Sequence, residues 1–277
     1  MIKMSSPHTH TCFVDGKNTA REMIESAIKK GLGSIGFSEH SYVDHDIDYC
    51  LTAKQTKVYI EEIKRLKREF KDKIKIYLGI ECDKTSNIDL TPYEYVIGSV
   101  HYLKDKKTGK FWSVDSNKQQ IVNCCNEVYN GDYMALAKDY YSEIEKMAEK
   151  IKPDIIAHYD LITKFNDDLF DEQSKEYQSI AKKPIKNILK TGAIFEINSG
   201  AVFRGNKNFP YPNSFLINYL NKLNAPIIIS SDAHCTDALG FYWDEMISLL
   251  KNNGFNKMKV LNDKFDKIAS CFDDVLI

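Results

Sequence analysis

The regular alternation of short apolar runs with amphipathic segments is the feature that most limits how this chain can fold. A short strand is predicted to lead to His8, and apolar runs predict further strands over about 34–38, 74–80, 95–100, 154–157, 193–197 and 226–229. Between them, the sequence predicts helices over about 19–30, 52–70, 116–150, 172–190, 213–223 and 242–252, with a Lys- and Gly-rich turn at 104–110. Parallel strands need a crossover, which is usually a helix. Seven such units therefore predict an α/β fold with a closed or nearly closed barrel.

Length and charge restrict the domain organisation and the partners. The 277 residues can form one large domain or two smaller ones, and the lack of an internal repeat or a flexible linker favours a single domain over residues 1–277. Lys and Arg total 38 against 39 for Asp and Glu, so no charge excess points to nucleic acid or to an acidic membrane. The apolar run at 225–229 is too short to span a bilayer, and the N-terminus has no secretory apolar region.

The seven cysteines form a scattered, odd-numbered set without a Cys-x-x-Cys pair. This pattern is typical of reduced thiols and predicts a cytoplasmic protein. Cys82 and Cys235 lie beside candidate ligands, but we interpret them as small buried side chains rather than thiolate ligands.

Histidines and acids gather where the predicted strands end. His8 and His10, like Asp232 and His234, are two residues apart, so the members of each pair project from the same face of an extended chain. Further candidates that follow apolar runs are His40, Glu81, His101 and His158. Six of the seven histidines, all except His45, occupy such ends. Imidazoles and carboxylates at one end of a barrel predict a single cluster of divalent metal ions.

The ordered motifs resemble the polymerase-and-histidinol-phosphatase (PHP) superfamily over about residues 7–240. The matching segments are His8–His10, Asp15–Gly16, Ser38–His40, Gly79–Glu81, Gly98–Tyr102, His158 and Ser231–His234. Within it, the chain looks most similar to the stand-alone histidinol-phosphate phosphatases, through the segments 98–102, 158–165 and 196–200 and the following Arg204.

The resemblance implies a distorted (βα)7 TIM-like barrel that holds three divalent metal ions of zinc, manganese or iron. By position, the first ion would be held by His8, His10, Glu81 and Asp232. Glu81 would bridge to a second ion, completed by His101 and His158. The third would be held by Asp15, His40 and His234. Some relatives have histidine where this chain has Asp15, and a carboxylate, being a harder ligand, favours manganese or iron.

The implied activity is hydrolysis of L-histidinol phosphate to L-histidinol and phosphate in histidine biosynthesis. Clustered metal ions activate water and offset charge on a phosphate, which suits this reaction. The candidate catalytic residues are Glu81, Asp232, His234, Asp15 and His40. Arg204, in a Gly- and Asn-rich loop, is the first candidate for binding the phosphate and Lys164 the second, although either is also compatible with a solvated surface role.

Several alternatives stay open from the sequence. The enzyme could act on a sugar phosphate or a nucleotide, or the barrel could be a non-catalytic metal-binding module, although no ligand is missing. In the loop at 42–48, Asp44, Asp46 and Asp48 could contact the amine of a cationic substrate or simply be solvated. Glu39 could orient an imidazole or make a hydrogen bond at a strand end, and Asn198 and Ser199 could touch the substrate. The sequence assigns neither the oligomeric state nor the acid that protonates the leaving alcohol.

Overall fold

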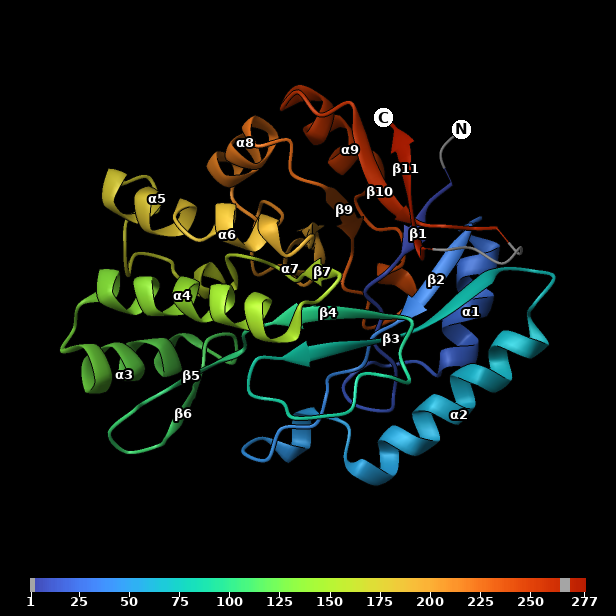
Figure 1. Cartoon of the computed structure of the whole chain (residues 1–277), viewed down its shortest axis with the longest axis horizontal. Coiled ribbons are helices and arrows are strands. Elements are labelled where there is room, and N and C mark those ends of the chain that lie inside the picture. The colour runs from blue at the N-terminus through green and yellow to red at the C-terminus, as the bar shows by residue number, and fades with distance from the viewer. Residues whose placement is uncertain (1–2, 265–269) are drawn as a thin grey trace.

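Seven parallel strands form the barrel in the computed structural model, which describes residues 3–264 and 270–277 (Figure 1). In sheet order these strands are β1 (Ser5–Ser6), β2 (Ser34–Phe37), β3 (Lys75–Asp83), β4 (Tyr95–Ser99), β7 (Ile155–Ile156), β8 (Ile194–Asn198) and β9 (Ile227–Ser230). Neighbours pair in parallel from β1 through to β9. The predicted α/β class is confirmed.

The barrel closes at the carboxyl ends of its strands. Just beyond β1 and β9, Thr9 and Ala233 form a parallel bridge, in which the amide of His10 donates to the carbonyl of Ala233 at 2.9 Å. At the opposite end, β10 (Lys257–Leu261) lies beside β9, and the hydroxyl of Ser34 donates to the carbonyl of Leu261 at 2.7 Å. An antiparallel strand, β11 (Phe272–Leu276), follows β10. Because β10 pairs with β9 at this end of the barrel, the barrel is distorted, as the family resemblance implies.

Helices surround the barrel, with α2 along one side and α3 to α6 on the opposite side (Figure 1). Their bounds are α1 (Ala20–Lys29), α2 (Ala53–Glu69), α3 (Lys118–Tyr129), α4 (Tyr133–Ile151), α5 (Lys175–Lys182), α6 (Ile185–Lys190), α7 (Gly200–Phe203), α8 (Ser214–Lys222) and α9 (Trp243–Asn252). Capping boxes at Thr19 and Thr52 start α1 and α2, because each hydroxyl accepts from a backbone amide three residues later. Among the described residues, no helix is long and apolar enough to cross a membrane.

The alternation of side chains along β3 places a carboxylate inside the barrel. Ile76, Leu78 and Ile80 pack outward in a hydrophobic cluster with residues of α1 and α2. Tyr77, on the other face, belongs to a separate small cluster together with Tyr95 of β4. Because alternate residues of a strand share a face, Glu81 points the same way as Tyr77, at the carboxyl end of the barrel interior.

The structure differs from the sequence predictions in three places. The turn at 104–110 connects a two-stranded antiparallel hairpin, β5 (Tyr102–Lys104) and β6 (Phe111–Ser113), which was not predicted. The single helix predicted over 172–190 is divided in two near Pro184, whereas the helices predicted over 116–150 are α3 and α4, separated where Asn130 and Gly131 adopt positive φ. Strands β10 and β11 were also missed, although Lys and apolar residues alternate along 257–261.

Candidate metal centre

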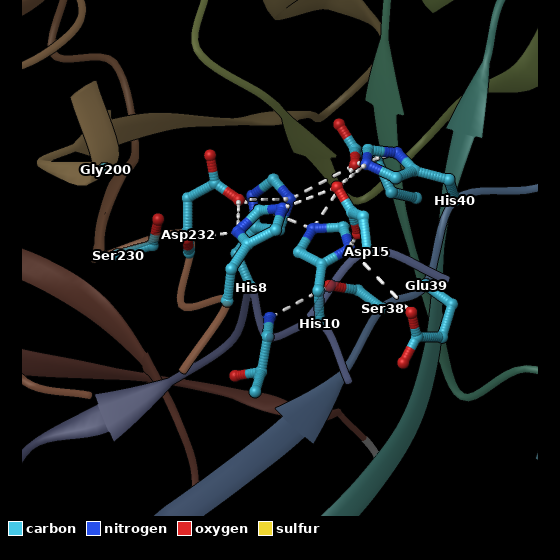
Figure 2. Close-up of polar contacts among 12 residues, drawn as sticks. His8, His10, Asp15, Ser38, Glu39, His40, Gly200, Ser230 and Asp232 are labelled. Carbon is cyan, nitrogen blue, oxygen red and sulfur yellow. Dashed lines mark hydrogen bonds and ion pairs between the residues drawn. The ribbon is translucent and has the colours of Figure 1, made fainter. Parts of the chain in front are cut away.

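Nine imidazole and carboxylate side chains converge at the carboxyl ends of the barrel strands. Figure 2 shows His8, His10, Asp15, His40 and Asp232 directed toward one another. The polar atoms form four overlapping groups, each with ligand atoms within 4.8 Å of one another: His10, Asp15, His40 and His234; His8, Glu81 and His158; His8, His10 and Asp232; and His40, Glu81 and His101. These groups contain all nine residues predicted as metal ligands and no cysteine from the part of the chain that the structure describes.

Glu81 occupies the centre of this cluster, and its two oxygens face different histidines. Oε2 lies 3.3 Å from His8 Nε2 and 2.8 Å from His40 Nδ1. Oε1 lies 3.1 Å from His158 Nε2 and 3.4 Å from His101 Nε2. Each oxygen of Glu81 therefore faces at least two imidazoles, and Glu81 would contribute ligand atoms to more than one metal ion of the cluster.

Two further sets of short distances complete the cluster. Oδ1 of Asp232 lies 3.5 Å from His8 Nε2 and 3.4 Å from His10 Nε2. Oδ2 of Asp15 lies 3.1 Å from His234 Nε2 and 3.6 Å from the Nε2 of His40. Asp232 also adopts a φ of 47°, which L-residues rarely take and which clusters at functional sites.

Buried polar atoms without partners indicate that the cluster fits divalent cations. His8 and His10 are fully buried, yet within the part of the chain that the structure describes His8 Nε2, both ring nitrogens of His10 and Oε2 of Glu81 have no hydrogen-bond partner. Such atoms are costly in a protein interior unless something satisfies them. Imidazole nitrogens and carboxylate oxygens are donors that zinc, manganese and iron accept.

The electrostatics of the cluster keep its carboxylates ionised. Burial alone would raise the pKa of Glu81, but the surrounding imidazoles, first that of His40, hold it well below its usual range. The pKa of Asp232 is likewise lowered, against burial, by His8 and Arg204. Burial, helped by the imidazoles of His234 and His40, lowers the pKa of His10 to about 3. The ionised carboxylates and the neutral imidazole of His10 are in the forms that bind metal ions. The neighbouring carboxylates, in turn, raise the pKa of His8 and His40 against burial.

Glu196, which was not predicted as a site residue, contacts His8 and His158 of the cluster. Its Oε1 lies 2.7 Å from His8 Nδ1 and accepts from the hydroxyl of Ser230 at 2.6 Å. Its Oε2 accepts from the backbone amide of His158 at 2.7 Å and from the side-chain amide of Asn198 at 2.9 Å. A carboxylate on Nδ1 fixes the tautomer and leaves Nε2 of His8 free to face Glu81. Glu196 lies in the segment 196–200, one of the motifs that carry the family resemblance, and this position could have identified it from the sequence.

Other residues near the cluster have structural partners. Glu39 accepts from the backbone amide of Thr11 at 2.8 Å through Oε1, which is the predicted strand-end hydrogen bond, and its Oε2 lies 4.0 Å from His10 Nδ1, so it also faces an imidazole as the other alternative requires. Asn198 holds Glu196, and the hydroxyl of Ser199 donates to the carbonyl of Phe241 at 3.1 Å.

The two predicted phosphate-binding cations lie in different surroundings. Arg204 follows α7, is one-third exposed, and donates from Nη2 to Asp232 Oδ2 at 2.9 Å. It therefore borders the cluster directly. Lys164 donates to the carbonyl of Asp115 at 2.9 Å and lies 3.6 Å from that residue's carboxylate. It lies in the wall of a cavity of about 420 Å³ that is also lined by Asp15, Glu81 and His101 of the cluster.

A seven-stranded parallel barrel with this cluster at its carboxyl ends defines a metal-binding α/β-barrel protein. The chain belongs to the PHP domain family, whose sequence model matches residues 6–200. The predicted resemblance is therefore confirmed.

Named relatives cover nearly the whole chain. A histidinol-phosphatase of Bacillus subtilis is 23% identical over 258 residues, which are 87% of this chain and 96% of the relative. A histidinol-phosphatase of Lactococcus lactis is 26% identical over 279 residues, 96% of this chain and 97% of the relative. The crystal structure of histidinol phosphate phosphatase from Lactococcus lactis, in complex with Zn, L-histidinol and phosphate, superposes with a TM-score of 0.70 at 22% identity, covering 96% of this chain and 99% of that one. The shared fold is the distorted TIM-like barrel.

Proposed function

We propose that this protein is a metal-dependent phosphomonoesterase that hydrolyses L-histidinol phosphate to L-histidinol and inorganic phosphate. The observation that carries the proposal is the buried carboxylate of Glu81. Its Oε2 faces the imidazoles of His8 and His40, and its Oε1 faces those of His101 and His158. Near-complete coverage of relatives with histidinol-phosphatase names supports the choice of substrate. In the reaction, the oxygen of water bonds to phosphorus, the bond from phosphorus to the alcohol oxygen breaks, and that oxygen takes up a proton.

The nine clustered residues would hold three divalent ions of zinc, manganese or iron, in the sets that the family resemblance implies. Bound divalent ions supply Lewis-acid chemistry, polarising phosphoryl oxygens and activating water at neutral pH. Glu81, Asp232, His234, Asp15 and His40 are the proposed catalytic residues. All five belong to the cluster, and Asp15, His40 and Glu81 also line the cavity.

Arg204 would contribute a fixed positive charge beside the cluster, and its planar guanidinium suits two phosphate oxygens. Lys164, already paired with Asp115, is the second candidate for the phosphate.

We also propose that residues 1–277 form one domain that works in the cytoplasm on a small-molecule phosphate, without a nucleic-acid or membrane partner. The seven cysteines support a reducing compartment, because none forms a disulfide. The near balance of acidic and basic residues supports the absence of a polyanionic partner.

Two measurements test the function: metal content per chain by elemental analysis, and phosphate release from a panel of small phosphates. About three ions per chain with selective turnover of L-histidinol phosphate is the expected result. A full complement of metal ions with turnover of sugar phosphates or nucleotides instead would mean that one of these compounds, and not L-histidinol phosphate, is the substrate. A metal-poor, inert protein would indicate a binding module.

Replacement of Glu196 by Gln should weaken metal binding by about 10- to 100-fold, the usual effect of removing a carboxylate that orients a ligating histidine. The amide keeps the size of the side chain but removes the charge that accepts from His8 Nδ1. Metal affinity is measured by competition with a chelator, which needs no turnover. The matched control, Glu94→Gln, changes a carboxylate distant from the cluster and should leave the affinity unchanged. Unchanged affinity in Glu196→Gln would remove this residue from the support of the site.

Replacement of Arg204 by Ala should chiefly raise the KM for the phosphate ester, by about 10- to 100-fold, because a charged hydrogen bond to phosphate is lost. Arg204→Lys, which keeps the charge but loses the planar fork, should fall between the wild type and Arg204→Ala. Steady-state kinetics of phosphate release measure both constants. An unchanged KM in Arg204→Ala would exclude this residue from the phosphate site.

A further inference from the structure

The cavity beside the metal cluster has a second end that the proposed chemistry does not use. One end is formed by cluster residues, among them His40, Glu81 and His101. The other end is lined by the segment after β2 and by the β5–β6 hairpin, including Asp46, Tyr102 and Phe111. A phosphate at the cluster would therefore leave its organic part in this outer end, and the whole cavity of about 420 Å³ is large enough for a small molecule.

Aromatic rings hold the segment after β2 against the hairpin. The ring of His45 stacks on Phe111 with 3.7 Å between centroids and an interplanar angle of 7°. The ring of Tyr102 meets the edge of His45 at 4.5 Å. The hydroxyl of Tyr102 donates to Asp46 Oδ2 at 2.7 Å. The carboxylate of Asp46 is thus fixed at the wall of the cavity by a neutral donor.

Asp46 is also the cavity carboxylate whose charge is left uncompensated. Asp15 and Glu81 face the imidazoles of the cluster. Asp83 accepts from the backbone amide of His101 at 2.8 Å and lies 3.3 Å from its Nδ1. Asp115 pairs with Lys164. Within residues 3–264 and 270–277, no Lys, Arg or His nitrogen lies within 4.0 Å of the Asp46 carboxylate.

We propose that Asp46, positioned by Tyr102, binds a protonated amine on the organic part of the substrate and so selects cationic phosphate monoesters. This inference rests on the proposed function and names the residue that gives it specificity. The half-buried carboxylate of Asp46 accepts one hydrogen bond, from the neutral hydroxyl of Tyr102. That bond does not neutralise the carboxylate and leaves further acceptor sites for an ammonium group. The stacked rings of His45 and Phe111 provide a flat surface for the rest of the organic group.

Two pairs of compounds test the inference by kcat/KM for phosphate release. The first pair is L-histidinol phosphate and 3-(imidazol-4-yl)propyl phosphate, which lacks only the amine. The second is 2-aminoethyl phosphate and ethyl phosphate. For each pair that the wild type hydrolyses, kcat/KM should be about 10- to 100-fold higher for the member with the amine, as expected for a charged hydrogen bond. Asp46→Asn should abolish this preference and leave kcat/KM for the amine-free member unchanged. Tyr102→Phe should reduce the preference in part.

The matched control is Asp48→Asn, which removes an exposed carboxylate from the same segment outside the cavity lining and should change neither compound. Equal losses on both members of a pair in Asp46→Asn, or no loss, would overturn the inference. Failure of the proposed function has a different result: the wild type would release no phosphate from L-histidinol phosphate. In that case the second pair still decides the role of Asp46, and a wild type without preference for the amine would contradict it.

Discussion

Replacement of Glu81 by Gln should remove bound metal and lower kcat/KM by about 10³-fold or more. The change preserves the volume of the side chain and removes the one charge that faces both sets of imidazoles. Metal ions contribute several kcal/mol to such reactions, and each 1.36 kcal/mol corresponds to a factor of ten in rate. Elemental analysis and phosphate-release kinetics on the same sample measure the two losses together.

The neighbouring position provides the control for this variant. Cys82 is on the same strand but points to the opposite face from Glu81, so Cys82→Ala should keep the metal content and the turnover of the wild type. Full metal content and normal turnover in Glu81→Gln would contradict a bridging role for this carboxylate. Loss of turnover with full metal content would assign Glu81 to the reaction without a role in metal binding.

Removal of the metal ions by a chelator should lower the melting temperature markedly and reversibly. A ligand at 1,000 times its dissociation constant stabilises the folded state by about 4 kcal/mol per site. For a chain of this size, that corresponds to a fall of roughly 8 to 16 °C for each site emptied. The physical reason is that the buried nitrogens of His8 and His10 and the carboxylate of Glu81 lose their partners. Calorimetry before chelation, after it, and after return of metal provides the measurement.

Glu81→Gln also provides the control for chelation. Because this variant should bind little metal, the same treatment should change its melting temperature much less than that of the wild type. An identical fall in both proteins would mean that the chelator acts on something other than this cluster. No change in the wild type would contradict the presence of structural metal in the folded protein.

Much of the cluster could be predicted from the sequence because the topology of a parallel barrel determines where strands end. Glu81, His101 and His158 each follow an apolar run, and all such ends meet at one rim of the barrel. Asp232 and His234 are two residues apart, so their side chains were predicted to share a face from the period of an extended chain alone. The nine predicted residues were therefore brought together by a fold that the alternation of strands and helices already implied.

The sequence missed features that depend on pairing between distant residues. The β5–β6 hairpin is short, and its flanking residues resemble a simple loop. Strand β10 pairs with β9 through a single register position, Lys259 with Ile228, so its place depends on packing rather than on local preference.

By itself, the sequence determined the class of fold, the residues that gather at the barrel rim and the family to which the chain belongs. These follow from local periodicity and from the order of strands, which are properties of the chain as written. Only the tertiary structure decided that Glu81 divides its oxygens between two sets of imidazoles, that Glu196 supports His8, and that Asp46 faces a cavity beside Tyr102. Hydrogen bonds and ion pairs act over a few ångströms, so they are fixed by the packing of elements that no local pattern records.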